Sequence, residues 1–118
     1  MTEEEIKQAE HEKWENLFKP GNGEIIKSAK VMKRNWWYFY QDRKLTLTNE
    51  PRLMYFTGDE YRGDIKLTKD LKTEYISNDR FNLINTKSGT AKYFKVYSND
   101  SAKQWCKLIN KVLKYVKE

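Results

Sequence analysis

The stretch AKQWCKLINKVLKYVK at residues 102–117 decides the fold. Its apolar residues recur at spacings of three and four, which is the period of one face of an α-helix. This face comprises Ala102, Trp105, Cys106, Ile109, Val112, Leu113 and Val116. The lysines mostly fall outside it and are expected in solvent; they are Lys103, Lys107, Lys111, Lys114 and Lys117. The pattern predicts a C-terminal helix, capped by Ser98 or Asn99, whose apolar face is buried on another element.

The residues before this helix read as short strands separated by turns. Turn-forming residues occur at 49–51, 57–60 and 87–90. The segments between them are rich in aromatic and β-branched residues, which favours strands. The expected strands are 24–32, 36–48, 52–56, 61–67, 73–77, 80–85 and 92–98. The chain is therefore expected to be mainly β: a seven-stranded antiparallel barrel or sandwich with the C-terminal helix over one open end.

The first residues predict an additional helix. Thr2 is a suitable cap, and the glutamates that follow suit the positive end of a helix dipole. The Pro and Gly residues of KPGNG at 19–23 end this helix. We expect residues 1–23 to form an N-terminal extension that packs on the sheet through Trp14, Leu17 and Phe18, and residues 24–118 to form the main domain. Trp36, Trp37 and Trp105 are expected in the core or the barrel wall.

Composition bounds the function. The chain has 118 residues and a formal net charge of +6, which favours one domain with an anionic partner. The single cysteine, Cys106, and the single histidine, His11, leave no disulfide, no Cys-based zinc site and little basis for a Ser-His-Asp triad. The acidic start is unlike a signal peptide, and no apolar run is long enough to span a membrane. We expect a cytoplasmic binding domain without catalytic activity or a cofactor.

The candidate binding residues are cations near the expected strand ends. Arg43 shares a face with Leu45 and Leu47, so it should lean toward the interior, where a cation needs an anion. Residues 28–35 are predicted to form a loop with several cations and no acid. Arginine and lysine bind phosphates through charge-assisted hydrogen bonds. The predicted set is Lys27, Lys30, Lys33, Arg34, Arg43, Arg62 and Lys92.

Seven strands followed by a helix with an early tryptophan resemble the pleckstrin homology (PH) domain family. RGDIKL at 62–67 is similar to the family's fourth strand. Within the family, the likeness is greatest to the C-terminal PH domain of the 3-phosphoinositide-dependent protein kinases. The segments that carry it are KWENLF at 13–18, KLTLTNEPRLMYF at 44–56 and AKQWCKLINKV at 102–112.

This resemblance implies an inositol phosphate site at the open end of the barrel, opposite the helix. The family pattern places a basic residue at the end of the first strand, which Lys27 matches, and a final arginine in the second strand, which Arg43 matches. Gln41 stands where the pattern has a Lys or Arg; it can bond to a phosphate but brings no charge. Val31 and Met32 are expected at the loop tip, dipping into the headgroup region.

The implied ligands are phosphoinositide lipids or soluble inositol phosphates. The implied role is recruitment of a serine/threonine protein kinase to the inner face of the plasma membrane, by peripheral association. The Gly-rich loop, His-Arg-Asp and Asp-Phe-Gly motifs of a kinase do not occur in this sequence.

One alternative is a PH-like module that binds protein partners, with weak or no lipid specificity. Nucleic-acid binding is disfavoured, because the sequence has no RNP-like or helix-turn-helix pattern.

Overall fold

The computed structural model describes residues 2–18, 23–35 and 37–117, and for residues 13–16 and 117 it describes only the backbone. The chain forms one helix, seven strands and a final helix, the order that the sequence predicts. The elements are α1 (Glu3–Phe18), β1 (Ile25–Arg34), β2 (Tyr40–Thr48), β3 (Arg52–Thr57), β4 (Glu60–Lys66), β5 (Leu71–Ser77), β6 (Arg80–Asn85), β7 (Ala91–Val96) and α2 (Ala102–Lys117).

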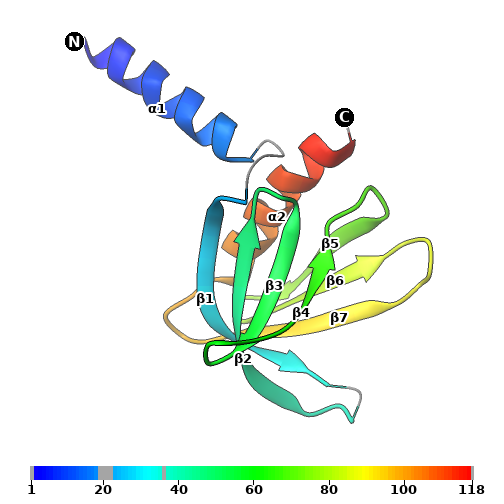
Figure 1. Ribbon diagram of the computed structural model, residues 1–118. Helices are drawn as coiled ribbons and strands as arrows, with labels where there is room; N and C mark the ends of the chain where they lie inside the picture. The colour runs from blue at the N-terminus through cyan, green and yellow to red at the C-terminus, as the bar shows by residue number, and fades with distance from the viewer. Residues whose placement is uncertain (1, 19–22, 36, 118) are drawn as a thin grey trace.

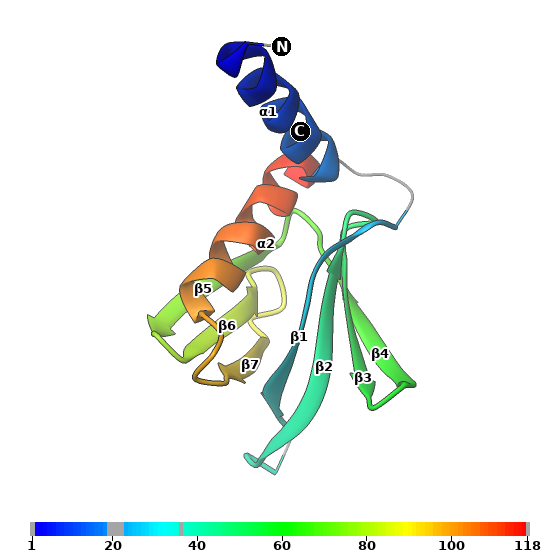
Figure 2. The same ribbon diagram turned by 90° about the vertical axis from the view of Figure 1, so that its left-hand side faces the viewer.

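The strands form one bent antiparallel sheet in the order β4-β3-β2-β1-β7-β6-β5. Strands β1–β4 make one layer, β5–β7 make the other, and α2 lies at one end next to β5 (Figures 1 and 2). The two layers join where Val31–Lys33 of β1 pairs with residues 94–96 of β7. Beyond this short junction the β1–β2 hairpin continues alone, away from both helices (Figure 1).

The predicted apolar face of α2 forms the centre of the core. Trp105, Ile109 and Val112 have no exposed surface. The Trp105 ring stacks on Phe81, with centroids 6.3 Å apart, and Phe81 stacks on Phe94 at 5.1 Å. Lysines 103, 107, 111 and 114 are exposed as expected, while the side chain of residue 117 lies outside the described part. The expected caps were wrong, because α2 starts later.

Ser101 is the residue that caps α2. Its hydroxyl accepts a hydrogen bond from the backbone N–H of Gln104 at 3.2 Å. A serine three residues before a glutamine is a capping-box sequence, which satisfies a helix-end N–H that has no partner in the helix.

Residues 28–34 belong to strand β1, so the predicted loop at 28–35 was wrong. Val31 is completely buried, and Met32 lies inside the strand, so neither residue stands at a loop tip. The connection to β2 comes later, at residues 35–39, and Trp37 is 61% exposed rather than in the core. Trp36 lies outside the described residues. Basic residues that alternate with apolar ones suit a strand with one wet face equally well, which explains the error.

Helix α1 begins as predicted, with the Thr2 hydroxyl accepting a hydrogen bond from the backbone N–H of Glu5. Most of the helix extends away from the domain, and residues 3–12 are exposed (Figures 1 and 2). Its last residue, Phe18, is buried, with the ammonium of Lys111 5.1 Å from its ring centroid. The described contact of α1 is with α2. The Trp14 side chain lies outside the described part, so the packing of this helix on the sheet stays a prediction.

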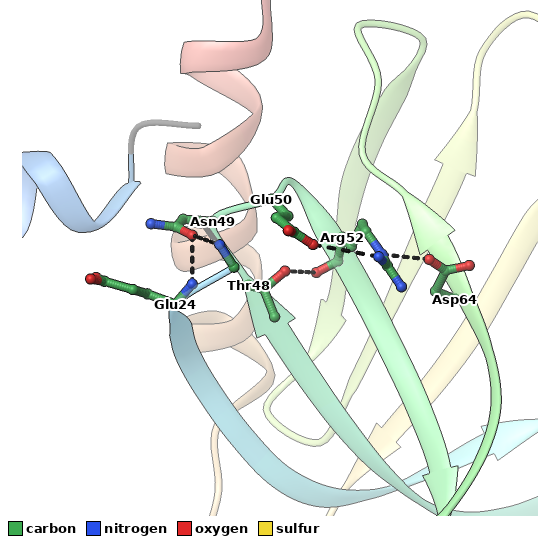
Figure 3. Close-up of polar contacts among 7 residues, drawn as sticks. Glu24, Thr48, Asn49, Glu50, Arg52 and Asp64 are labelled. Atoms are coloured by element: carbon green, nitrogen blue, oxygen red, sulfur yellow. Dashed lines mark hydrogen bonds and ion pairs between the residues drawn. The ribbon is translucent and has the colours of Figure 1, made fainter. Parts of the chain in front are cut away.

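Asn49 fastens the start of β1 to the β2–β3 turn. Its side-chain oxygen accepts hydrogen bonds from the backbone N–H groups of Gly23 and Glu24, at 3.0 and 2.7 Å (Figure 3). The side chain is 3% exposed, so water cannot replace it easily. Next to this turn, the Arg52 guanidinium forms ion pairs with the carboxylates of Glu50 and Asp64, so its charge is already compensated (Figure 3).

Replacing Asn49 with alanine is expected to lower the free energy of unfolding by about 1–2 kcal/mol, because two partly buried backbone N–H groups lose their acceptor. Urea denaturation followed by circular dichroism measures this loss. Asn99→Ala, an exposed asparagine in the loop before α2, is the matched control and should change stability little. Equal stability of the two variants would show that the Asn49 contacts contribute nothing net.

Candidate anion-binding site

The inner face of the β1–β2 hairpin changes from apolar to basic along its length. Directly paired residues of an antiparallel sheet point to the same face. Val31, which is buried, pairs with Arg43, so the Arg43 side chain belongs to the inner face as predicted. Two residues further along, Lys33 pairs with Gln41 on that face. The core therefore ends in cations at the end of the barrel that lies opposite α2.

A third cation comes from the other layer of the sheet. Lys92 of β7 pairs with the buried Leu83 of β6, so it also belongs to the inner face. We call Lys33, Arg43 and Lys92 the mouth cluster. Burial and the charges of Lys92 and Arg43 together lower the pKa of Lys33 from its ordinary value. Within the described part of the chain, no residue of the mouth cluster forms an ion pair with a carboxylate.

Neutral groups hold two of these cations in place. The Arg43 guanidinium donates hydrogen bonds to the Gln41 side-chain oxygen at 2.9 Å and to the backbone oxygen of Asp42 at 2.7 Å. The Lys33 ammonium lies 5.2 Å from the ring centroid of Tyr55. Tyr55 in turn sits against Gly63, where an added Cβ would come within 2.6 Å of the tyrosine hydroxyl. The cluster is therefore positioned but not neutralised.

A cavity of about 460 Å³ opens beside the mouth cluster, where β1 and β7 separate. The cations that line it are Lys33, Arg34 and Lys92, and no carboxylate lines it. A second groove of about 570 Å³ lies over the β1–β2 strands, but its lysines and Arg43 are accompanied by Asp42 and Asp59. An anion therefore finds uncompensated positive charge only in the first of these two cavities.

The structure places Lys27 at the opposite end of β1, roughly 20 Å along the strand from Lys33. Its ammonium lies 2.9 Å from the Asp100 carboxylate and donates to Gln104 at 3.2 Å. It also lies 5.1 Å from the Trp105 ring centroid. Because β1 continues to Arg34, the basic inner-face residue near its end is Lys33 and not Lys27.

Lys30 and Arg62 also lie away from the mouth cluster. Lys30 is exposed on the outer face, 3.5 Å from the carboxylate of Asp42, which also accepts a hydrogen bond from the Tyr97 hydroxyl. These contacts, the tyrosine first, lower the pKa of Asp42. Arg62 is exposed, and its guanidinium lies 3.4 Å from Glu60. The predicted set therefore separates, with only Lys33, Arg34, Gln41, Arg43 and Lys92 gathered at the mouth.

Aromatic side chains that the sequence analysis assigned to a strand stand beyond the mouth cluster. Trp37, Tyr38 and Phe39, which we call the aromatic tip, are 61, 75 and 70% exposed. The tip connects β1 to β2, so it continues from the hairpin that carries Lys33 and Arg43. A sequence signal for it exists: the five aromatic residues in succession at 36–40 cannot all face one side of a strand, and Asn35 before them favours a turn.

Among the described residues, no helix is long and apolar enough to cross a membrane. The same residues contain no group of three His, Cys, Asp or Glu side chains arranged to hold a metal ion.

Comparisons with known proteins agree with this architecture. The family model described as the PH domain matches residues 12–118. The C-terminal PH domain of pleckstrin, solved with D-myo-Ins(1,2,3,5,6)P5, has a TM-score of 0.65 and 21% identity over 79% of this chain and 99% of its own. The PH domain of human oxysterol binding protein-related protein 11 has a TM-score of 0.58 and 21% identity over 82% and 87%.

A third similar structure is the complex of human RhoA with a DH/PH fragment of PDZRhoGEF, with a TM-score of 0.66 and 12% identity over 78% of this chain and 29% of the other. No curated protein sequence matched significantly. Identities this low establish the fold alone, whereas the family model covers most of the sequence. The chain therefore belongs to the PH domain family.

Proposed function

We propose that this PH domain binds the phosphorylated headgroup of a phosphoinositide, or the free inositol phosphate, at the mouth cluster. PH domains are binding modules without catalytic activity of their own, and many bind phosphoinositides. The observation that carries the proposal is the convergence of Lys33, Arg43 and Lys92 on one face with no carboxylate partner among the described residues. The similar pleckstrin domain was solved with an inositol pentakisphosphate.

The lowered pKa of Lys33 supports the proposal. Three cations held together repel one another, and a bound phosphate would remove that repulsion. Phosphate oxygens also form charge-assisted hydrogen bonds with lysine and arginine. Gln41 adds an amide that remains able to donate to a phosphate while its oxygen holds Arg43.

The aromatic tip favours a membrane-bound headgroup over a free one. Tryptophan and tyrosine are enriched where a bilayer meets water, because their rings are apolar and carry one polar group. The tip is connected to the mouth cluster by β1 and β2, so a headgroup at the cluster brings the tip to the lipid surface. This corrects the expectation that Val31 and Met32 dip into the bilayer; Trp37, Tyr38 and Phe39 take that role.

The test is a titration with soluble inositol phosphates and with vesicles that carry single phosphoinositide isomers. We expect headgroup-dependent binding that Arg43→Ala weakens by roughly tenfold or more, since a charge-assisted bond contributes about 1.5–3 kcal/mol. Arg62→Ala is the matched control, because it removes an exposed arginine outside the cluster. Isomers that differ only at the 3-phosphate test whether Gln41 permits selectivity at that position.

Equal binding of all phosphate-bearing vesicles by the natural chain and by Arg43→Ala would contradict a headgroup site. A folded domain that binds no inositol phosphate at all would instead favour a protein-interaction module.

For the longer protein, we propose a serine/threonine kinase whose PH domain recruits it to the plasma membrane. The support is the likeness of three segments of this chain to the phosphoinositide-dependent kinases. One of these segments contains the Trp105–Cys106 pair, which is buried in this domain. A reading frame around this sequence that lacks the kinase motifs would contradict the proposal.

A further inference from the structure

The aromatic tip has a fixed backbone although its side chains are in solvent. The Asn35 side-chain oxygen accepts hydrogen bonds from the backbone N–H groups of Trp37 and Phe39, both at 3.0 Å. The Asn35 backbone adds a donor to the Phe39 oxygen at 2.8 Å and an acceptor for the Tyr38 N–H at 3.1 Å. One asparagine thus makes four hydrogen bonds to a loop of five residues.

A stack of side chains holds the same loop from the outer face. The Arg34 guanidinium carbon lies 3.6 Å from the ring centroid of Tyr93 on β7 and 5.0 Å from that of Tyr38. The tip is therefore connected through Arg34 to a strand of the second layer. Such contacts between a guanidinium and an aromatic ring are attractive.

The shape that these contacts hold is a costly one. Tyr38 has φ of 68°, the left-handed region that a bulky residue seldom adopts. It is the single residue other than glycine with positive φ among those that the structure describes. Three adjacent aromatic side chains also stay largely exposed to water. The positive φ and the exposed rings both disfavour folding. We therefore infer that the hydrogen bonds from Asn35 maintain the conformation of the loop rather than the stability of the domain.

We propose that Asn35 is a positioning residue, which fixes the aromatic tip in its lipid-binding shape before the domain reaches a bilayer. This inference rests on the proposed headgroup function, because the lipid surface is the partner of both sites. A preformed loop does not lose conformational freedom on binding, so the entropic cost of binding is smaller and the affinity is higher. Asn35 therefore affects attachment to a bilayer, while the mouth cluster reads the headgroup.

The experiment compares two ligands that share one headgroup. The natural chain and its variants are titrated with phosphatidylcholine vesicles containing a phosphoinositide, and with the matching soluble inositol phosphate. Asn35→Ala is expected to weaken vesicle binding roughly five- to tenfold, and soluble binding by less than about twofold. Asn35→Ser should recover part of the vesicle affinity, because a serine hydroxyl makes the same kind of turn more weakly. Thermal unfolding verifies that each variant is folded.

Trp37→Ala serves as the reference, since it removes an anchoring ring without removing the turn. If Trp37→Ala loses vesicle affinity and Asn35→Ala does not, the positioning role is wrong and the headgroup function stands. If Asn35→Ala weakens both ligands equally, Asn35 supports the pocket and not the tip, which also overturns the inference. If the natural chain binds neither ligand, the proposed function itself has failed.

Discussion

A chain carrying Lys33→Met and Arg43→Leu together is expected to bind inositol phosphates at least about a hundredfold more weakly than the natural chain. Two charge-assisted hydrogen bonds of about 1.5–3 kcal/mol each account for this loss. The same double variant should unfold at a higher temperature without ligand, because it removes mutual repulsion on a partly buried face. Calorimetric titration and thermal unfolding measure the two effects.

The sign of the pH dependence follows from Lys33. Its pKa is below the ordinary 10.5 in the folded chain and returns there on unfolding, so between the two values the unfolded chain binds more protons. Stability of the ligand-free domain should therefore rise as pH increases through that window. The double variant should lack this contribution of Lys33.

A control with the same change in net charge is Lys103→Gln with Lys107→Gln, because both lysines are exposed on α2. If this control weakens binding as strongly as the mouth variant, then long-range attraction explains the affinity and the mouth cluster is not a specific site.

Trp105→Ala is expected to lower the free energy of unfolding by about 3–5 kcal/mol. The ring is completely buried, and its indole N–H donates to the Asp100 carboxylate at 2.8 Å. Burial alone would raise the pKa of Asp100, but the hydrogen bonds from Lys27 and Trp105 keep it below the usual range. The variant loses both the core packing and one of the donors that hold this buried charge.

Trp37→Ala is the matched substitution at an exposed site and should leave the unfolding temperature nearly unchanged. Denaturant unfolding of both variants measures the contrast. A comparable loss of stability at the two tryptophans would show that the tip, and not only the α2 face, is part of the folded core.

The order and type of elements could be predicted because their signals are local. The apolar face of α2 and the alternation that places Leu45 and Leu47 inside β2 depend only on nearby residues. Arg43 follows from the same alternation, since it shares the face of Leu45. Where the period is clear and the turns contain Asn, Pro or Gly, tertiary contacts reinforce the local preference.

The errors arose where the pairing between strands, and not the local composition, determines where a strand ends. Lysine and arginine suit a loop and a solvated strand equally, so the end of β1 was placed too early and Lys27 was taken for its last inner cation. Lys27 forms an ion pair with Asp100, which is distant in sequence, so the residues around Lys27 do not indicate this partner. The aromatic tip was misjudged because the five consecutive aromatic residues at 36–40 predict burial by composition, whereas the Asn35 bonds hold a turn in which Trp37, Tyr38 and Phe39 are exposed.

Both termini lie at the helix end of the domain, and the β1–β2 hairpin points the other way (Figures 1 and 2). A domain anchored by that hairpin presents both of its attachment points toward the aqueous phase. Any segment joined before α1 or after α2 would then start on the side of the domain that faces away from the lipid.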